Sequence, residues 1–235
     1  MLEKFKALSV FAGIFVAPFP LEDAKAFAEN FRAHNAAFDA EPMIRSLPPK
    51  SSPEIPRIIC LNKTKTLVVE FAPVKINVRK IDTPVKRSLR DVYADFKPLL
   101  ERTHAYLTEY VATKIIRLGC VCQLFVHLTQ SANQKIGSYF LKHSFFDKAE
   151  EIHLSTLHKV SLAPNLLVNR WIKVHPVRTA PPQQRDTGLM VEVDINTRAE
   201  QTYTFTAHEF LSFYDSVISH VDRQIEFLND TSFLG

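Results

Sequence analysis

The sequence predicts an α+β fold made of two pseudo-repeated halves, each with the order β-α-β-β-(β)-α. Three observations lead to this prediction: long apolar strands are expected over 8–19 and 114–128, a helix follows each of them at once, and each half closes with a longer helix. We therefore expect antiparallel sheets backed by long helices, packed side by side or edge to edge. The halves are residues 1–112 and 113–235, and together they should form one compact unit.

The first half begins with a strand over 8–19 that is apolar on both faces, as in a strand covered on two sides. Pro20 then opens a helix with apolar residues at i, i+3, i+4 and i+7. Residues 42–56 contain five prolines, which remove backbone donors and fix φ, so this stretch is expected to be a surface connection. A hairpin should follow, with strands over 57–62 and 66–79.

The apolar positions of the segment 66–79 change parity midway along it. Because side chains alternate with a period of two in a strand, we expect one extra residue, a β-bulge at Ala72-Pro73. Ser88 and Asp91 have the spacing of a capping box and predict the start of a helix that runs to about residue 111. Pro98 lies inside this helix and predicts a kink or two abutting helices.

The second half opens with a strand over 114–128, whose even positions from Ile116 onward are all apolar. A helix is expected over 132–143. Further strands are expected over 152–160, 166–178, 187–196 and 201–205. The polar loop 179–187 is long for a hairpin and is a candidate functional loop. Thr206 and Glu209 form a capping box that begins a final helix over 207–229.

Cysteine usage and hydropathy indicate a cytoplasmic protein. Cys60, Cys120 and Cys122 all lie in apolar strand-like segments, without the spacing of a metal site or a disulfide framework. The apolar run 7–17 follows a charged start, as in a secretory signal, but Pro18 and Pro20 stand where small residues of a cleavage site belong, so we interpret the run as a strand. No apolar stretch is long enough for a membrane-spanning helix, and we expect no membrane partner.

Three segments carry a resemblance to a known family: Arg170-Trp171-Ile172-Lys173-Val174, the strand 188–195, and the aromatic start of the last helix at 210–214. With the order of elements, they resemble a sporadically distributed, uncharacterised bacterial protein family of roughly this length. The resemblance implies an accessory role in bacteria and carries over no activity, cofactor or catalytic residue. The order of elements is also similar to TATA-binding-protein-like and helix-grip architectures, a likeness of topology that assigns no function.

The first candidate binding surface lies on the strand that contains Trp171. Trp171, Lys173 and His175 share one face of this strand, whereas Arg170 and Arg178 lie on the other face near its ends. A tryptophan beside cations on a sheet can stack against a base, another ring or a side chain of a partner. The alternative is that Trp171 packs under a helix and Lys173 lies at the margin.

A second candidate surface is a basic cluster within residues 75–90. It contains Lys75, Arg79, Lys80, Lys86, Arg87 and Arg90. The cluster adjoins a predicted helix start, where backbone N–H groups also favour anions, so it is a candidate phosphate-binding surface. The alternative is a solvated charged face, because the net charge of +4 permits an anionic partner without requiring one.

The sequence offers little support for catalysis. None of the nine histidines stands in a metal-binding spacing, and no nucleotide-binding or nucleophile motif occurs. Glu192 and Asp194 share one face of their strand, as paired carboxylates for acid–base chemistry do, but exposed alternation explains them better. We therefore predict no catalytic residues, no metal and no cofactor.

The eighteen phenylalanines favour a protein partner or self-association, with a thick core as the alternative. The sequence thus predicts a non-catalytic interaction or regulatory module of an accessory bacterial system. One alternative is a nucleic-acid-binding protein that uses the basic cluster at 75–90. Another is a helix-grip-type binder of a small ligand, with its pocket between a sheet and the helix 207–229.

Overall fold

A computed structural model describes residues 4–48, 50–85, 87–128, 131–141, 152–163, 166–177, 188–201 and 203–230. The first half contains β1 (Lys6–Val16), α1 (Ala24–His34), β2 (Met43–Ile44), β3 (Ile58–Leu61), β4 (Leu67–Ala72), β5 (Lys75–Ile81), α2 (Leu89–Ala105) and η1 (Tyr106–Tyr110). The second half contains β6 (Ile115–His127), α3 (Ala132–Ile136), η2 (Gly137–Leu141), β7 (Leu154–Ala163), β8 (Leu166–Val177), β9 (Gly188–Thr197) and α4 (Ala207–Asp230). Both η elements are π-helical turns that directly continue the preceding helix.

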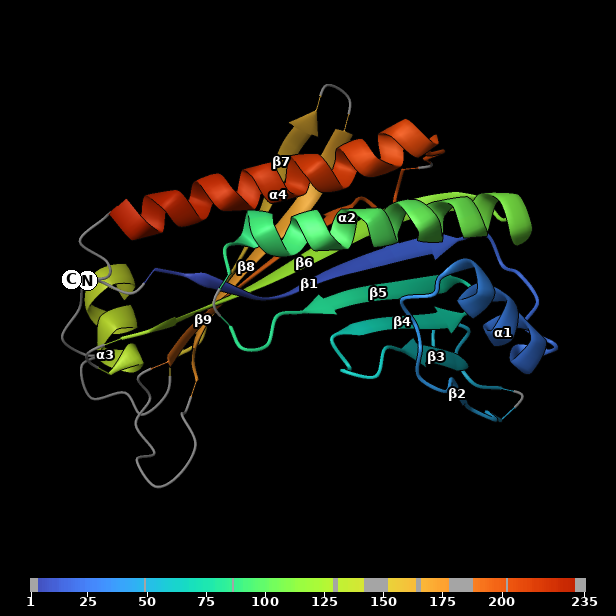
Figure 1. Ribbon diagram of the computed structural model, residues 1–235. Coiled ribbons are helices and arrows are strands. Elements are labelled where there is room, and N and C mark those ends of the chain that lie inside the picture. Colours follow the sequence, from blue (N-terminus) through green and yellow to red (C-terminus); the bar gives the residue numbers. More distant parts are fainter. Residues whose placement is uncertain are drawn as a thin grey trace.

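The nine strands form a single sheet in the order β2-β3-β4-β5-β1-β6-β9-β8-β7, and every pairing is antiparallel (Figure 1). The predicted α+β class is therefore confirmed. The strands of the two halves join edge to edge through β1 and β6, where Val10 lies opposite Cys122 and Ala12 opposite Cys120. From this central pair the order outward is β5-β4-β3-β2 on one side and β9-β8-β7 on the other.

Three helices lie on the same face of the sheet. Figure 1 shows α2 and α4 next to each other on this face, and α2 contacts β1 and β5 while α4 contacts β6 and β7. The even-numbered side chains from Val10 to Val16 in β1 and from Leu118 to Val126 in β6 point to these helices, and Ala12, Ile14, Cys120 and Cys122 are fully buried. The pattern predicted for β6 does not include its first even position, because Ile116 is 39% exposed beyond the register shift at Val16. The uninterrupted apolar positions of the two strands thus form the floor of the core.

Helix α1 packs on this face through an aromatic cluster. The Phe31 ring lies 4.8 Å from that of Phe71 on β4, 5.4 Å from that of Phe38 and 5.1 Å from that of Tyr106 at the start of η1. All four side chains are buried. Edge-to-face and tilted contacts of this kind stabilise a core beyond the area that they bury. The cluster therefore joins α1, the sheet and the end of α2.

Both predicted capping boxes are confirmed at the helix starts. The Oγ atom of Ser88 accepts a hydrogen bond from the Asp91 N–H at 3.2 Å, and that of Thr206 accepts one from the Glu209 N–H at 3.2 Å. Helix α2 continues through Pro98 without a break, so the alternative of two abutting helices is wrong. None of the described helices is long and apolar enough to span a membrane.

The segment 66–79 differs from its prediction. It is two strands, β4 and β5, which pair as a hairpin from Ala72 opposite Lys75, and no bulge at Ala72-Pro73 is needed. The physical reason is that a two-residue turn also reverses parity: Phe71 and Ile76 face each other and point to the same side of the sheet. Pro73 lies at the turn, where its missing N–H costs no hydrogen bond between the strands, so the proline is compatible with a turn as well as with a bulge.

Smaller differences concern other predicted elements. The connection 42–56 contains the short strand β2, which pairs with β3. Residues 203–205 belong to no strand in the structure. The helix expected over 132–143 is α3 followed by η2, and its last two residues, like the loop 179–187, lie outside the described residues.

The buried His104 on α2 is expected to make the free energy of unfolding depend on pH. Its side chain is buried against the Phe210 ring of α4, with ring centroids 4.8 Å apart, and its Nε2 atom has no hydrogen-bond partner among the described residues. Burial lowers the pKa of His104, and Glu109 opposes this only in part. The folded state therefore binds fewer protons than the unfolded state near and below the unfolded pKa of histidine, about 6.5.

We expect the free energy of unfolding to decrease as the pH falls from about 7.5 to about 5.5, because protons bind the unfolded state preferentially. The variant His104→Leu should lose part of this decrease, and the exposed His208→Leu should keep it. Urea denaturation at several pH values measures both effects. An identical pH dependence in wild type and His104→Leu would contradict the assignment. The pH dependence that remains in His104→Leu is expected to come from His175 and His220, because burial is the main cause that lowers their pKa values as well.

Candidate functional site

The sheet face turned away from α2 and α4, which we call the accessible face, carries a mixture of charged, aromatic and amide side chains. Strand register aligns them in rows. One row runs from Arg79 through Phe11, Val121 and Asp194 to Trp171, across β5, β1, β6, β9 and β8. All five residues of this row are half-buried or exposed. On the helix side, by contrast, the aligned side chains of Ala12 and Cys120 are fully buried. The accessible face is therefore a surface available for binding.

Five side chains form what we call the cation–aromatic cluster: Phe11, Phe15, Lys75, Arg79 and Arg117. The Phe15 ring lies between two cations, with Lys75 Nζ 4.8 Å and the Arg117 guanidinium carbon 4.6 Å from its centroid. The Arg79 guanidinium carbon lies 5.3 Å from the centroid of Phe11. Cations at these distances are attracted to the electron-rich faces of the rings.

Gly13 lies between the two phenylalanines on β1, and both rings come close to it. A Cβ atom at Gly13 would lie 3.7 Å from Cε1 of Phe11 and 3.9 Å from Cε2 of Phe15. Gly13 pairs with Gly119 on β6, so two neighbouring strands lack side chains at this point. The Phe11 and Phe15 rings therefore approach a part of the sheet that carries no side chains.

The three cations of the cluster lie near one acid, Asp194 on β9, but do not pair with it. In the part of the chain that the structure describes, no ion pair joins Lys75, Arg79 or Arg117 to a carboxylate. The cluster therefore leaves a positive field on β5, β1 and β6. Such a field favours an anionic ligand at this position.

A hydrogen-bonded network crosses the accessible face beside the cluster. Lys173 Nζ donates to Glu192 Oε1 at 2.7 Å, and Gln123 Nε2 donates to Glu192 Oε2 at 3.0 Å. The Ser9 hydroxyl in turn donates to Gln123 Oε1 at 2.8 Å. The network connects β8, β9, β6 and β1, and it fixes the positions of these polar side chains before any ligand binds.

The two carboxylates on β9 are held in different environments. Burial opposes ionisation of Glu192, but the hydrogen bonds from Lys173 and Gln123 outweigh it and lower its pKa. Burial raises the pKa of Asp194, although Asn196 Nδ2 donates to its Oδ1 at 3.1 Å. Among the described residues, no three His, Cys, Asp or Glu side chains gather in a way that could hold a metal ion. Glu192 is therefore held within the network and Asp194 by Asn196, and both carboxylates lie on the strand next to the cation–aromatic cluster.

The structure divides the residues of the first candidate surface between the two faces. Trp171, Lys173 and His175 lie on the accessible face, and Trp171 is 37% exposed beside Leu157 of β7, so it does not pack under a helix. Arg170 points to the other face, where its Nη1 lies 2.8 Å from Nε2 of His220 on α4. Arg178 lies outside the described residues.

The basic cluster at 75–90 is divided as well. Lys75 and Arg79 lie on the accessible face, whereas Lys80 has the opposite parity on β5. Arg90 Nε lies 2.5 Å from the Asp222 carboxylate of α4. Lys86 lies outside the described residues. Only Lys75 and Arg79 thus join the cation–aromatic cluster.

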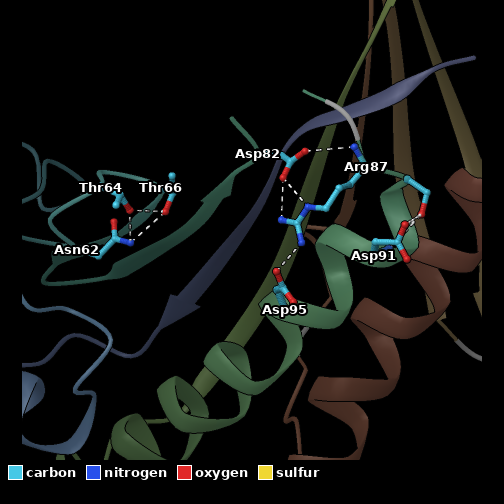
Figure 2. Close-up of polar contacts among 8 residues, drawn as sticks. Asn62, Thr64, Thr66, Asp82, Arg87, Asp91 and Asp95 are labelled. Carbon is cyan, nitrogen blue, oxygen red and sulfur yellow. Dashed lines mark hydrogen bonds and ion pairs between the residues drawn. The ribbon is translucent and has the colours of Figure 1, made fainter. Parts of the chain in front are cut away.

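Arg87 supports the fold between two acids. Figure 2 shows its guanidinium reaching from Asp82, at the end of β5, to Asp95 on α2, with distances of 2.7 and 2.6 Å. The side-chain hydrogen bonds to Asp95 and Asp82 raise the pKa of Arg87. Asp82 is buried, so the pair holds the start of α2 against the sheet and leaves little charge for a phosphate.

Three members of the cation–aromatic cluster were missed as site residues by sequence reasoning: Phe11, Phe15 and Arg117. The phenylalanines were attributed to a core or a protein interface, and Arg117 is a single charge in an apolar strand. The signal that finds them is the register of β5, β1 and β6, in which Lys75 lies opposite Phe15 and Phe15 opposite Arg117.

No protein-family model matches the sequence, and no curated protein matches it. The function must therefore be inferred from the side chains of the accessible face and their geometry. The residues that carry most of this inference are the two half-buried rings and the three cations around them.

Proposed function

We propose that this protein is a non-catalytic binding module that holds single-stranded nucleic acid on the accessible face of its sheet. The observation that carries the proposal is the cation–aromatic cluster, in which two rings lie among three cations that have no acidic partner in the described residues. Sequence-tolerant binding of single strands combines these two components, aromatic rings that stack on bases and cations that contact phosphates.

The flexible cations allow both contacts to form. Lys75, Arg79 and Arg117 have long side chains that can turn from the ring faces toward phosphates. That movement frees the faces of Phe11 and Phe15 for bases, while each cation exchanges a cation–π contact for a stronger charge-assisted hydrogen bond. The cluster is therefore suited to release its internal contacts when a strand binds.

The width of the cluster favours one strand over a duplex. Its side chains lie on β5, β1 and β6, which together span about 10 Å because neighbouring strands are about 4.8 Å apart. The acidic residues Glu192 and Asp194 begin on the next strand, β9. A single sugar–phosphate chain fits this basic strip, whereas the second strand of a duplex would meet the carboxylates.

A protein partner is a second candidate, and one observation favours it. Trp171 and Leu157 lie opposite each other on β8 and β7 and are 37% and 46% exposed. A large apolar pair at the margin of a sheet is typical of a contact with another polypeptide or a second copy of the chain. This contact would lie beside the cation–aromatic cluster and does not exclude it.

The proposed setting is an accessory system of a bacterial cytoplasm. It rests on the resemblance described above and on three free, buried cysteines. We also propose that the two halves are structural repeats. The support is that β1-β5-β4-β3 and β6-β9-β8-β7 follow the same order outward from the centre of the sheet.

Charge reversal at the cluster tests the proposed function. The variant carrying Lys75→Glu and Arg117→Glu should bind a short labelled oligothymidylate at least about tenfold more weakly than wild type, because phosphate contacts supply most of such affinity. The plot of log affinity against log salt should have a slope of about −2 for wild type, from three cations at about −0.7 each, and about −0.7 for the variant. Fluorescence anisotropy at several salt concentrations measures both quantities.

The matched control carries Lys25→Glu and Arg102→Glu, which make the same change in net charge on exposed sites of α1 and α2. This control should retain wild-type affinity and slope. No binding by wild type at low salt, or an equal loss in the control, would rule out the cluster as a nucleic-acid site. Elution of wild type as a dimer without any oligonucleotide binding would favour the Trp171–Leu157 surface and a second copy of the chain.

A further inference from the structure

A polar groove lies on the other side of the sheet, between α4 and the edge strand β7. Its volume is about 310 Å³. Ser216, Ser219, His220 and Arg223 line it from α4, and their i, i+3, i+4 and i+7 spacing places them on one stripe of the helix. Ser161 of β7 lies opposite. The groove is thus lined by hydroxyl, imidazole and guanidinium groups from α4 and by Ser161 and the apolar Leu162 from β7.

The groove carries more positive than negative charge. Beneath it, Arg170 of β8 lies 2.8 Å from His220, and in the described part of the chain neither Arg170 nor Arg223 forms an ion pair with a carboxylate. The acid of the groove, Asp215, is already engaged: Lys97 Nζ lies 2.8 Å from its Oδ2, and the Tyr93 hydroxyl donates to its Oδ1 at 2.8 Å. Two guanidinium charges beside this groove therefore have no counter-ion among the residues that the structure describes.

The contact between Arg170 and His220 fixes the state of the imidazole. A guanidinium can only donate hydrogen bonds, so Nε2 of His220 must accept, which requires a neutral ring with its proton on Nδ1. Burial and the nearby charges of Arg170 and Arg223 lower the pKa of His220. An anion in the groove would oppose the two guanidinium charges and make the ring easier to protonate.

We infer that the groove between α4 and β7 binds a phosphate group, either free or as the monoester of a small molecule. Guanidinium groups match the oxygens of phosphate in charge and geometry, and serine hydroxyls donate further hydrogen bonds to them. The volume admits a phosphate with a small organic substituent. This site is independent of the proposed nucleic-acid surface, because it involves other residues on the opposite face of the sheet.

Titration of the full chain with inorganic phosphate tests the inference. Proton NMR of the imidazole resonances should show saturable shifts at His220, and phosphate should raise the pKa of His220 toward that of an ordinary histidine. The variant Arg223→Gln should bind phosphate about tenfold more weakly, as expected for loss of a charge-assisted hydrogen bond. The double variant Ser216→Ala, Ser219→Ala should bind it more weakly than wild type as well. The control Arg102→Gln, at an exposed site on α2, should bind as wild type does.

Two further measurements separate the possible ligands and the two proposals. Tighter binding of phosphoserine than of inorganic phosphate supports a monoester, and equal binding supports free phosphate. The Lys75→Glu, Arg117→Glu variant should retain phosphate binding in the groove whether or not it binds oligothymidylate. Unchanged phosphate affinity in Arg223→Gln, or the absence of any saturable shift at His220 in wild type, would overturn the inference.

Discussion

Replacement of both Phe11 and Phe15 by alanine is expected to weaken binding of single-stranded nucleic acid by about a hundredfold or more, since stacking contributes about 1–3 kcal/mol per base. The cations Lys75, Arg79 and Arg117 remain in this variant, so its salt dependence should stay close to that of wild type. Fluorescence anisotropy with labelled oligothymidylate measures the affinity and the salt slope together. Loss of affinity at constant slope is the signature that separates stacking from phosphate contacts.

The control for this experiment is Phe125→Ala. Phe125 also belongs to the accessible face of β6 and is half-buried, but its ring contacts His127, with centroids 4.7 Å apart, and no cation of the cluster. Its removal takes away a similar ring from the same sheet and should leave the affinity within about twofold, as surface substitutions generally do. Equal losses in the two variants would point to a general disturbance of the sheet and would remove the special role of Phe11 and Phe15.

The largest effect on stability is expected from Phe31→Ala. Phe31 is fully buried between α1, β4 and η1, and its removal deletes ring contacts with Phe38, Phe71 and Tyr106. Truncation of a buried phenylalanine generally costs about 3–5 kcal/mol, because lost transfer energy and the remaining cavity add. Equilibrium denaturation in urea should therefore show a midpoint shifted to much lower denaturant at an unchanged slope.

Tyr110→Ala is the comparison for this prediction. Tyr110 belongs to the same aromatic region, with its ring 5.7 Å from that of Tyr106 and 4.0 Å from that of His34, but it is 57% exposed. Its removal should cost less than about 1 kcal/mol, because little area returns to water and no cavity forms. A small loss in Phe31→Ala would mean that the cluster does not hold α1 to the sheet.

The regular elements were largely predictable because their signals are local. The period-two pattern of β6 from Leu118 onward and the capping boxes at Ser88 and Thr206 depend on neighbours within a few residues, and the structure confirms them. The hairpin β4–β5 was misassigned for a physical reason. A two-residue turn and a one-residue bulge both reverse the parity of the buried positions, so periodicity alone does not distinguish them.

The candidate site was less predictable because it depends on contacts between distant parts of the chain. Arg87 and Arg90 had the composition of a phosphate site, but Asp95 and Asp222 reach them from α2 and α4. Conversely, Arg117 is distant in sequence from Lys75 and Phe15, and only the pairing of β6 with β1 brings it to them. Counting charges along the sequence therefore overestimated the basic cluster at 75–90 and missed the cation–aromatic cluster.

The central pairing of β1 with β6 has a mechanical consequence. The antiparallel ladder between β1 and β6 joins the two halves along the middle of the sheet, and it opposes a movement of one half over a molecule bound to the other. We therefore expect the sheet to act as a rigid surface to which the ligand adapts its conformation. Binding to such a surface costs the protein little conformational entropy, and it favours flexible ligands that can lie flat on the sheet.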